Sequence, residues 1–432
     1  MNAPAKPVNR RLVAGMGMLL QMCLGTVYAW SYFQKPIMSA FGWSNSQTAW
    51  TFSLAIFSLG CAAAWGGMNL QKIGPRKLAL TGGLLFASGY LIAALALSLK
   101  NLPLLWVGYG IVGGAGLGLG YVTPVATAAK WFPDKKGLVT GMVIMGFGFG
   151  ALAMSKLIAP RLMAISGGNL VVVFLITGVL MFFITLPAAA FMINPPAAYN
   201  PPNYTQKNSE PKGAASSAAD RGPASAATSA KGSNAKDCIF SRRFLLMWLI
   251  FFLNIAAGIM LVGFQSPMLQ DILLKTNPST TAVLAAAAGA TLIAFSSVFN
   301  GLGRFLWGGI SDHFGQIGTF RLILGTEFFV FLAFPFVNSP LVFSILVCYV
   351  LLCYGGGFGT MPAFVLNEFG TEVMPVVYGA ILTAWSAAGI VGPQIAAILK
   401  DRVPDRAASL TFTIGAALLF IGFALTFLLR KK

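Results

Sequence analysis

The chain has 432 residues, of which 57% are hydrophobic and 9% are charged, and its mean hydropathy is +0.77. Soluble domains carry about 25% charged residues, so this composition excludes a soluble globular protein and indicates an integral membrane protein. The formal net charge of +18 would suggest nucleic-acid binding in a soluble chain. Here the basic residues lie mostly at the ends of apolar segments and report membrane topology instead, so nucleic acid is not an expected partner.

Twelve apolar segments are long enough to cross roughly 30 Å of hydrocarbon as helices. The sequence therefore predicts an all-α membrane protein with twelve transmembrane helices. The first segment is too long for a signal-peptide core and is predicted to be a transmembrane helix. The predicted spans are 12–34, 46–70, 77–99, 102–129, 138–160, 168–193, 243–272, 281–308, 320–337, 340–366, 375–399 and 408–429.

The stretch 195–241 between the sixth and seventh spans has a different composition. It is rich in Pro, Ala and Ser and nearly lacks bulky apolar side chains. Such a segment cannot bury enough surface to fold, so it is predicted to be a disordered cytoplasmic linker. The linker divides the chain into an N-terminal six-helix bundle at 1–194 and a C-terminal six-helix bundle at 242–432.

The distribution of basic residues predicts the orientation. With the N-terminus inside, 20 Lys and Arg residues fall on the cytoplasmic side and eight on the other side. The positive-inside rule therefore places both termini in the cytoplasm. We expect a monomeric, multi-pass protein of the inner (plasma) membrane, with the lipid bilayer as its surroundings.

The two halves of the chain resemble each other. Phe-Gln-x-Pro closes the predicted first and seventh helices at 33–36 and 264–267, and Trp-Gly-Gly ends the second and eighth at 65–67 and 307–309. Parallel six-helix repeats pack about a pseudo-two-fold axis along the membrane normal, with a substrate site between them near the midplane. The repeat therefore predicts a rocking transporter.

Arg304 lies inside the apolar eighth segment, where an arginine costs roughly 2.5–3.5 kcal/mol on insertion scales. Its guanidinium is a planar fork of donors that suits a carboxylate, so we interpret it as the binding group for a small organic anion. Asn300 precedes it by one turn, on the same helix face, and is expected to orient the arginine or bind the substrate. The alternatives are a structural arginine paired with carbonyls or a carboxylate, and an interhelical hydrogen bond from Asn300.

The loops 66–77 and 308–315 occupy matching places in the two halves. They resemble the cytoplasmic gate motif of the major facilitator superfamily, whose acidic and basic groups latch the inner side. The resemblance assigns gate roles to Lys72, Arg76 and Asp312. Gln71 stands at the usual acidic position of the first copy, which predicts a weaker latch there. His313 is interpreted as a solvated loop residue rather than a proton relay.

Several motifs agree in order and spacing with the oxalate/formate antiporter family, which lies close to the monocarboxylate porters. They are Gly-x-x-Tyr-x-Trp at 25–30, Lys-Trp-Phe-Pro-Asp-Lys-Lys-Gly at 130–137, Asn-Gly-x-x-Arg at 300–304 and Phe-Gly-Thr at 369–371. The resemblance covers all twelve spans and fails in the central linker. It implies a twelve-helix transporter of small carboxylates.

The resemblance also implies the substrate-binding residues. The arginine of the family's eighth helix matches Arg304, and the pocket tyrosines of the first and fourth helices match Tyr28 and Tyr121. Of the tenth-helix aromatic residues, one is present as Tyr354, and another, usually Tyr in the oxalate carrier, is Phe358 here. Without the resemblance, aromatic residues at helical spacing are more often packing or interface residues.

One departure from the oxalate carrier decides the expected substrate. That carrier has a lysine in its eleventh helix where this chain has Trp385. A dianion needs two cations, and an unpaired buried carboxylate would be costly. The expected substrate is therefore a monocarboxylate of the lactate, pyruvate or formate class, with an oxalate/formate-type exchanger as the alternative.

The sequence does not identify a residue that binds a coupled proton. Glu327 follows Arg321 by six residues and is expected to lie too near the helix end for a central relay. Asp271 and Glu368 also lie near helix ends, where snorkelling or pairing with Lys or Arg is usual. Protons are the expected second substrate of a symporter, while exchange and facilitated diffusion stay open.

The sequence argues against two other classes of protein. A non-transporting carboxylate sensor would need an output domain, and none is visible. An enzyme would need a Ser/His, paired-Asp or metal constellation within the spans, and the sequence has none. The five cysteines show no metal-binding spacing and the lone histidine has no partner, so no metal and no cofactor are expected.

Overall fold

The computed structural model describes residues 9–132, 136–196, 199, 235–370 and 373–429. Within them, twelve helices are long and apolar enough to cross a membrane, which confirms the predicted all-α membrane fold. Apart from the stretch between Ala190 and Arg242, described spans that follow one another in the chain are joined by short connections. The predicted linker lies mostly outside the described residues, but its last part contains a short helix, α10 (Ala235–Ile239).

Six spans form each half of the chain, and several are built from more than one helical segment. In the N-terminal half the elements are α1 (Arg10–Gly25), η1 (Thr26–Ala29), α2 (Trp30–Phe41), α3 (Asn45–Ile73), α4 (Pro75–Ser98), α5 (Leu102–Leu105), η2 (Trp106–Gly113), α6 (Gly114–Trp131), α7 (Lys136–Leu152), η4 (Ala153–Ile158), α8 (Ala159–Ile165) and α9 (Leu170–Ala190). In the C-terminal half they are α11 (Arg242–Thr276), α12 (Ala282–Phe314), α13 (Gln316–Ala333), η5 (Phe334–Phe336), α14 (Pro340–Phe369), α15 (Met374–Ile381), α16 (Thr383–Arg402), η6 (Pro404–Arg406), α17 (Ala407–Leu425) and η7 (Thr426–Leu428).

Several predicted helix ends are wrong by up to seven residues. Pro36 and Pro267 were expected to close helices, yet both lie inside helices, in α2 and α11. Membrane helices tolerate proline because neighbouring helices and local adjustments satisfy the freed backbone groups. The Trp-Gly-Gly segments also lie within α3 and α12, which continue to Ile73 and Phe314.

The turns that end α3 and α12 have matching geometry. Gly74 and Gly315 follow these helices with φ of +87° and +73°, a left-handed region that favours glycine. Helices α4 and α13 begin at once after them. The two loops predicted to be related by the repeat therefore make the same kind of turn.

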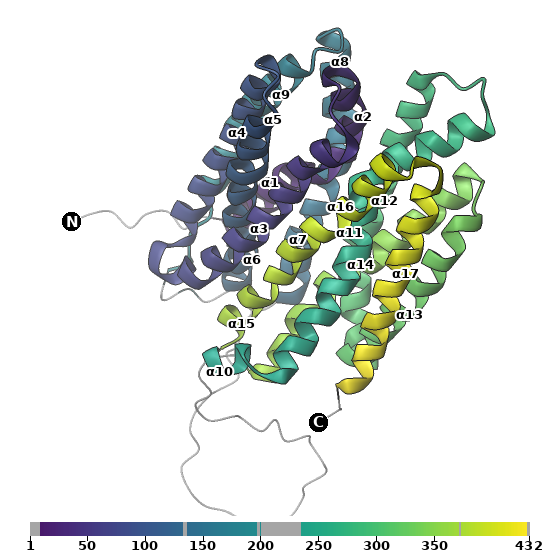
Figure 1. The fold of residues 1–432 in the computed structure, drawn as a ribbon. Coiled ribbons are helices and arrows are strands. Elements are labelled where there is room, and N and C mark those ends of the chain that lie inside the picture. The colour runs from purple at the N-terminus through teal and green to yellow at the C-terminus, as the bar shows by residue number, and fades with distance from the viewer. Residues whose placement is uncertain (1–8, 133–135, 197–198, 200–234, 371–372, 430–432) are drawn as a thin grey trace, which may run out of the picture.

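The two halves lie side by side, with the N-terminal helices on one side and the C-terminal helices on the other (Figure 1). They meet mainly where α3 packs on α16 and where α7 packs on α12. Glycine runs at 114–120 in α6 and 146–150 in α7 allow close packing within and between the halves. A Cβ at Gly116 would collide with the Phe86 backbone within the N-terminal half, and one at Gly148 with Ser297 across the two halves. Small residues let membrane helices approach in this way.

Candidate functional site

Arg304 lies in the second half of α12 and is 5% exposed. Its Nη1 donates a hydrogen bond to Tyr121 Oη at 3.1 Å. Its Nε and Nη2 have no hydrogen-bond partner, and none of the ion pairs among the described residues involves it. The guanidinium is therefore a buried cation with donors to spare, which is the arrangement that binds a carboxylate strongly.

Aromatic rings surround this guanidinium. Its Cζ lies 5.0 Å from the Phe358 ring centroid and 5.6 Å from that of Phe147, within the range of a cation–π contact. The edge of Trp385 meets the rings of Phe358 and Tyr121, with centroids 4.7 and 5.5 Å apart. These rings stabilise the Arg304 cation without neutralising its charge.

Tyr28 and Tyr354 face each other across the two halves, with their hydroxyl oxygens 2.7 Å apart. Tyr28 lies on the 3-10 turn η1 between α1 and α2, and short 3-10 segments within a helix often mark a hinge. Its ring also packs edge-on against Phe147, with centroids 5.1 Å apart. The pair thus joins the N-terminal half to α14 beside the arginine.

Asn300 lies one turn before Arg304 and is fully buried. Neither its Oδ1 nor its Nδ2 has a hydrogen-bond partner among the described residues, so the alternative of an interhelical hydrogen bond is not observed. Together with Tyr28, Ser297 and Gln265 it lines a cavity of about 10 Å³, which is near the lower limit for one water molecule. This cavity beside Asn300 is too small for a substrate anion.

The structure thus brings together the seven residues predicted to bind substrate. They are Tyr28, Tyr121, Asn300, Arg304, Tyr354, Phe358 and Trp385. With Tyr121, Phe358 and Trp385, Phe147 completes an aromatic cage around Arg304. Phe147 was missed by sequence reasoning. Its position between two glycines of the α7 run, where a large ring can enter the interface, was the available signal.

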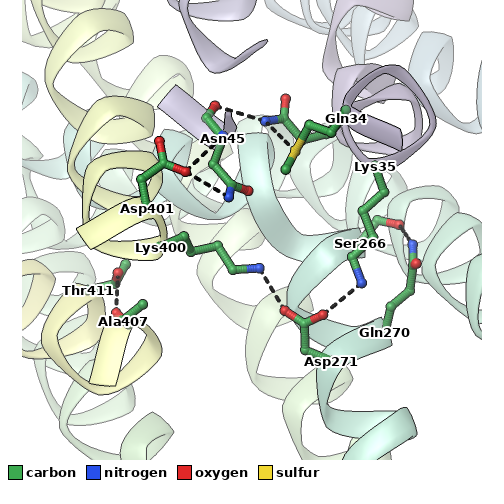
Figure 2. A network of polar contacts seen from close by, with 11 residues as sticks. Gln34, Lys35, Asn45, Ser266, Gln270, Asp271, Lys400, Asp401, Ala407 and Thr411 are labelled. Carbon is green, nitrogen blue, oxygen red and sulfur yellow. Dashed lines mark hydrogen bonds and ion pairs between the residues drawn. The ribbon is translucent and has the colours of Figure 1, made fainter. Parts of the chain in front are cut away.

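An ion-pair network joins the halves at the end opposite the α3–α4 and α12–α13 turns (Figure 2). Asp271 at the end of α11 bridges Lys35 of α2, at 2.7 Å, and Lys400 of α16, at 2.6 Å. Beside it, Asp401 accepts hydrogen bonds from the backbone and side chains of Asn45 and Ser46 at the start of α3. The sequence predicted pairing of Asp271 near its helix end, which is confirmed, but not that it would bridge the two halves.

The predicted cytoplasmic gate residues Lys72, Arg76 and Asp312 are exposed. No ion pair among the described residues joins them to one another. The middle of the 130–137 motif, at 133–135, and Thr371 lie outside the described residues. The cytoplasmic latch therefore stays a prediction, while the observed polar closure is at the other end.

We expect Asp271→Asn to weaken this closure, because it removes the charge that bridges Lys35 and Lys400. Partly exposed ion pairs contribute roughly 0–1 kcal/mol each, so the open population should rise about fivefold. Paired spin labels at Ser39 and Lys275, both exposed, would report the distance between α2 and α11. Asp405→Asn is the matched control, since Asp405 is exposed in η6 at the same end. An unchanged distance distribution in Asp271→Asn would show that the bridge does not hold this end closed.

Comparison with known proteins agrees with the twelve-helix fold. Residues 13–393 match the Major Facilitator Superfamily. The chain belongs to this superfamily. It is therefore a multi-pass membrane transporter and not an enzyme.

Two solved structures share the fold. A bacterial homologue of the human lysosomal transporter Spinster has a TM-score of 0.67 at 14% identity, over 98% of this chain and 97% of that one. The nucleoside transporter NupG has a TM-score of 0.68 at 12% identity, over 98% of this chain and 100% of that one.

Curated relatives extend the comparison to particular transporters. The oxalate:formate antiporter of Oxalobacter formigenes is 26% identical over 96% of this chain and 90% of its own length. The apicoplast pyruvate carrier 1 of Toxoplasma gondii is 23% identical over 87% and 80%. Monocarboxylate transporter 13 of Rattus norvegicus is 26% identical over 32% and 31%. The predicted resemblance to the oxalate/formate antiporter family is confirmed.

Proposed function

We propose that this transporter carries a small monocarboxylate anion by alternating access, with Arg304 as the counter-ion of the carboxylate. The observation that carries the proposal is the buried guanidinium with unpartnered Nε and Nη2. A carboxylate can fill both donors at once, which no other described group in the structure does. The likeness to carriers named for formate, pyruvate and monocarboxylates supports the substrate class.

The single cation of the cage supports a monoanion. Arg304 faces Phe147, Phe358 and Tyr121, and the fully buried Trp385 closes the wall beside them. A second carboxylate in this cage would meet aromatic surface and no second charge, which is costly in a low-dielectric site. In the membrane we place both termini and the α3–α4 and α12–α13 turns in the cytoplasm, because the basic residues gather on that side.

Transport assays with purified protein in proteoliposomes test this function. Vesicles loaded with unlabelled lactate, pyruvate or formate should take up the same labelled anion with saturable kinetics. Oxalate uptake into formate-loaded vesicles, without monocarboxylate self-exchange, would favour the oxalate/formate-type exchanger that the antiporter likeness suggests. The absence of saturable uptake of any of the four anions would contradict the proposal.

We expect Trp385→Lys to shift the preference toward dicarboxylates, because it places a second cation beside Arg304. The ratio of oxalate to lactate uptake should rise by about tenfold, the effect of one charge-assisted hydrogen bond. Trp385→Phe, which keeps an apolar wall, is the matched control and should keep the wild-type ratio. An unchanged ratio in a well-folded Trp385→Lys variant would count against the pocket.

A further inference from the structure

Glu327 is a second buried ionisable residue, and the substrate site does not use it. It lies on α13 and is fully buried, whereas the sequence placed it near the helix end. It follows the turn at Gly315 by twelve residues, and Arg304 precedes that turn by eleven. At 1.5 Å per residue, both lie about 17 Å from the turn. The expected shallow position of Glu327 is therefore wrong.

One amide holds this carboxyl group. Asn254 of α11 donates from Nδ2 to Glu327 Oε2 at 2.9 Å. Glu327 Oε1 and Asn254 Oδ1 are both buried without a hydrogen-bond partner among the described residues. The pair has two spare acceptors, and one proton on the carboxyl group would turn one of them into a donor. The arrangement thus favours the protonated carboxyl group of Glu327. When Glu327 Oε1 carries the proton, Asn254 Oδ1 remains as a hydrogen-bond acceptor.

None of the ion pairs among the described residues compensates Glu327. On α14 its titratable neighbours are Cys353 and Tyr349, which are neutral or negative. Helix α17 carries no titratable residue between Ala407 and Leu425. The cation of α12 at this depth, Arg304, forms its hydrogen bond with Tyr121 in the aromatic cage. A carboxylate here would be a lone buried charge, and ionisable groups in such positions usually mark proton or substrate paths.

The Glu327–Asn254 pair is linked to the substrate cage through α14. A Cβ at Gly357 would collide with Asn254 Oδ1, so this amide lies against the α14 backbone. The next residue, Phe358, packs on Phe251 of α11, with centroids 5.1 Å apart, and on the Arg304 guanidinium. A change in the amide when the proton leaves would therefore act on the helix that forms one wall of the substrate cage.

We propose that Glu327, held by Asn254, reversibly binds the proton that accompanies the anion, which makes the transporter a proton symporter. This inference rests on the proposed function. The step is a simple association: one proton joins the Glu327 carboxylate to give the neutral acid, and no other bond changes. Protonated Glu327 is uncharged, so the loaded transporter can change its orientation with the proton bound. The proton leaves when the site opens on the other side.

The test separates exchange from net transport in proteoliposomes. Exchange of labelled for unlabelled lactate, pyruvate or formate needs no net proton movement, whereas accumulation driven by an inward proton gradient does. We expect Glu327→Gln to keep exchange within about twofold and to lose gradient-driven uptake by about tenfold or more, as removal of a proton relay predicts. A trapped pH-sensitive dye should show substrate-dependent proton entry for wild type and none for the variant. Protein-free vesicles correct for passive leak of the neutral acids.

Two further variants sharpen the result. Glu327→Asp keeps a titratable group and should retain gradient-driven uptake with a shifted pH profile. Glu368→Gln is the matched control, because that carboxylate forms an ion pair with Arg243 at 2.8 Å near the ends of α11 and α14, and it should retain proton entry. Wild-type exchange without proton entry, normal accumulation by Glu327→Gln, or loss of exchange in that variant would overturn the inference. Loss of wild-type exchange itself would instead contradict the proposed function.

Discussion

Arg304→Lys is expected to reduce monocarboxylate uptake by about 10- to 100-fold, which is the loss of one or more charge-assisted hydrogen bonds. Lysine keeps the charge but cannot present a planar fork of donors. It also loses the contact with Tyr121 and the face-on packing between Phe147 and Phe358. Initial rates of labelled lactate, pyruvate and formate exchange in proteoliposomes measure the effect.

The control for this prediction is the same change on the neighbouring helix. Arg321 of α13 donates to Thr426 and packs on Phe427 outside the cage, so Arg321→Lys should keep wild-type uptake within about twofold, as an exchange of like charges at a partly exposed site. Thermal unfolding of both variants checks that they fold. Wild-type uptake by a folded Arg304→Lys protein would remove the arginine from the substrate site.

Gly359→Val is expected to abolish transport and to lower thermal stability. A Cβ at Gly359 would collide with the carbonyl oxygen of Arg304, as one at Gly355 would with that of Asn300. The added side chain forces α12 and α14 apart at the substrate cage, and overpacking of this kind costs about 1–3 kcal/mol. The unfolding temperature in detergent and the exchange rate in proteoliposomes report the two effects separately.

Gly309→Val provides the matched control on α12. No atom lies within 4 Å of a Cβ built at Gly309, and the residue is exposed. This variant should keep both the unfolding temperature and the exchange rate. If Gly359→Val behaved like Gly309→Val, the close approach of α12 and α14 would not be what shapes the site.

The twelve helices were predictable because hydrophobic length alone determines a membrane span. Their ends were less so. Pro36 and Pro267 indicate helix ends in soluble proteins, but here they lie within α2 and α11, where the surrounding helices satisfy the backbone. Hydropathy predicts which residues cross the hydrocarbon, but it does not predict where the helix ends.

The grouping of the residues proposed to bind substrate was predictable because family motifs locate them, beginning with Arg304. Phe147 was missed because its partners come from η1, α6, α12 and α16, and such a convergence leaves no local pattern in the sequence. The depth of Glu327 was misjudged from a predicted start at residue 320, while α13 begins at Gln316. The Asp271 bridge joins residues that are far apart in the chain, so only the fold reveals it.

Equilibrium binding to the purified protein tests the central claim most directly. A ligand that binds the folded state raises the unfolding temperature, without any need for transport. We predict that lactate, pyruvate or formate stabilises the wild-type protein in a saturable manner and does not stabilise Arg304→Gln, while oxalate has a weaker effect on either. Equal stabilisation of both proteins, or stabilisation of the wild type by oxalate alone, would contradict a monocarboxylate site built on Arg304.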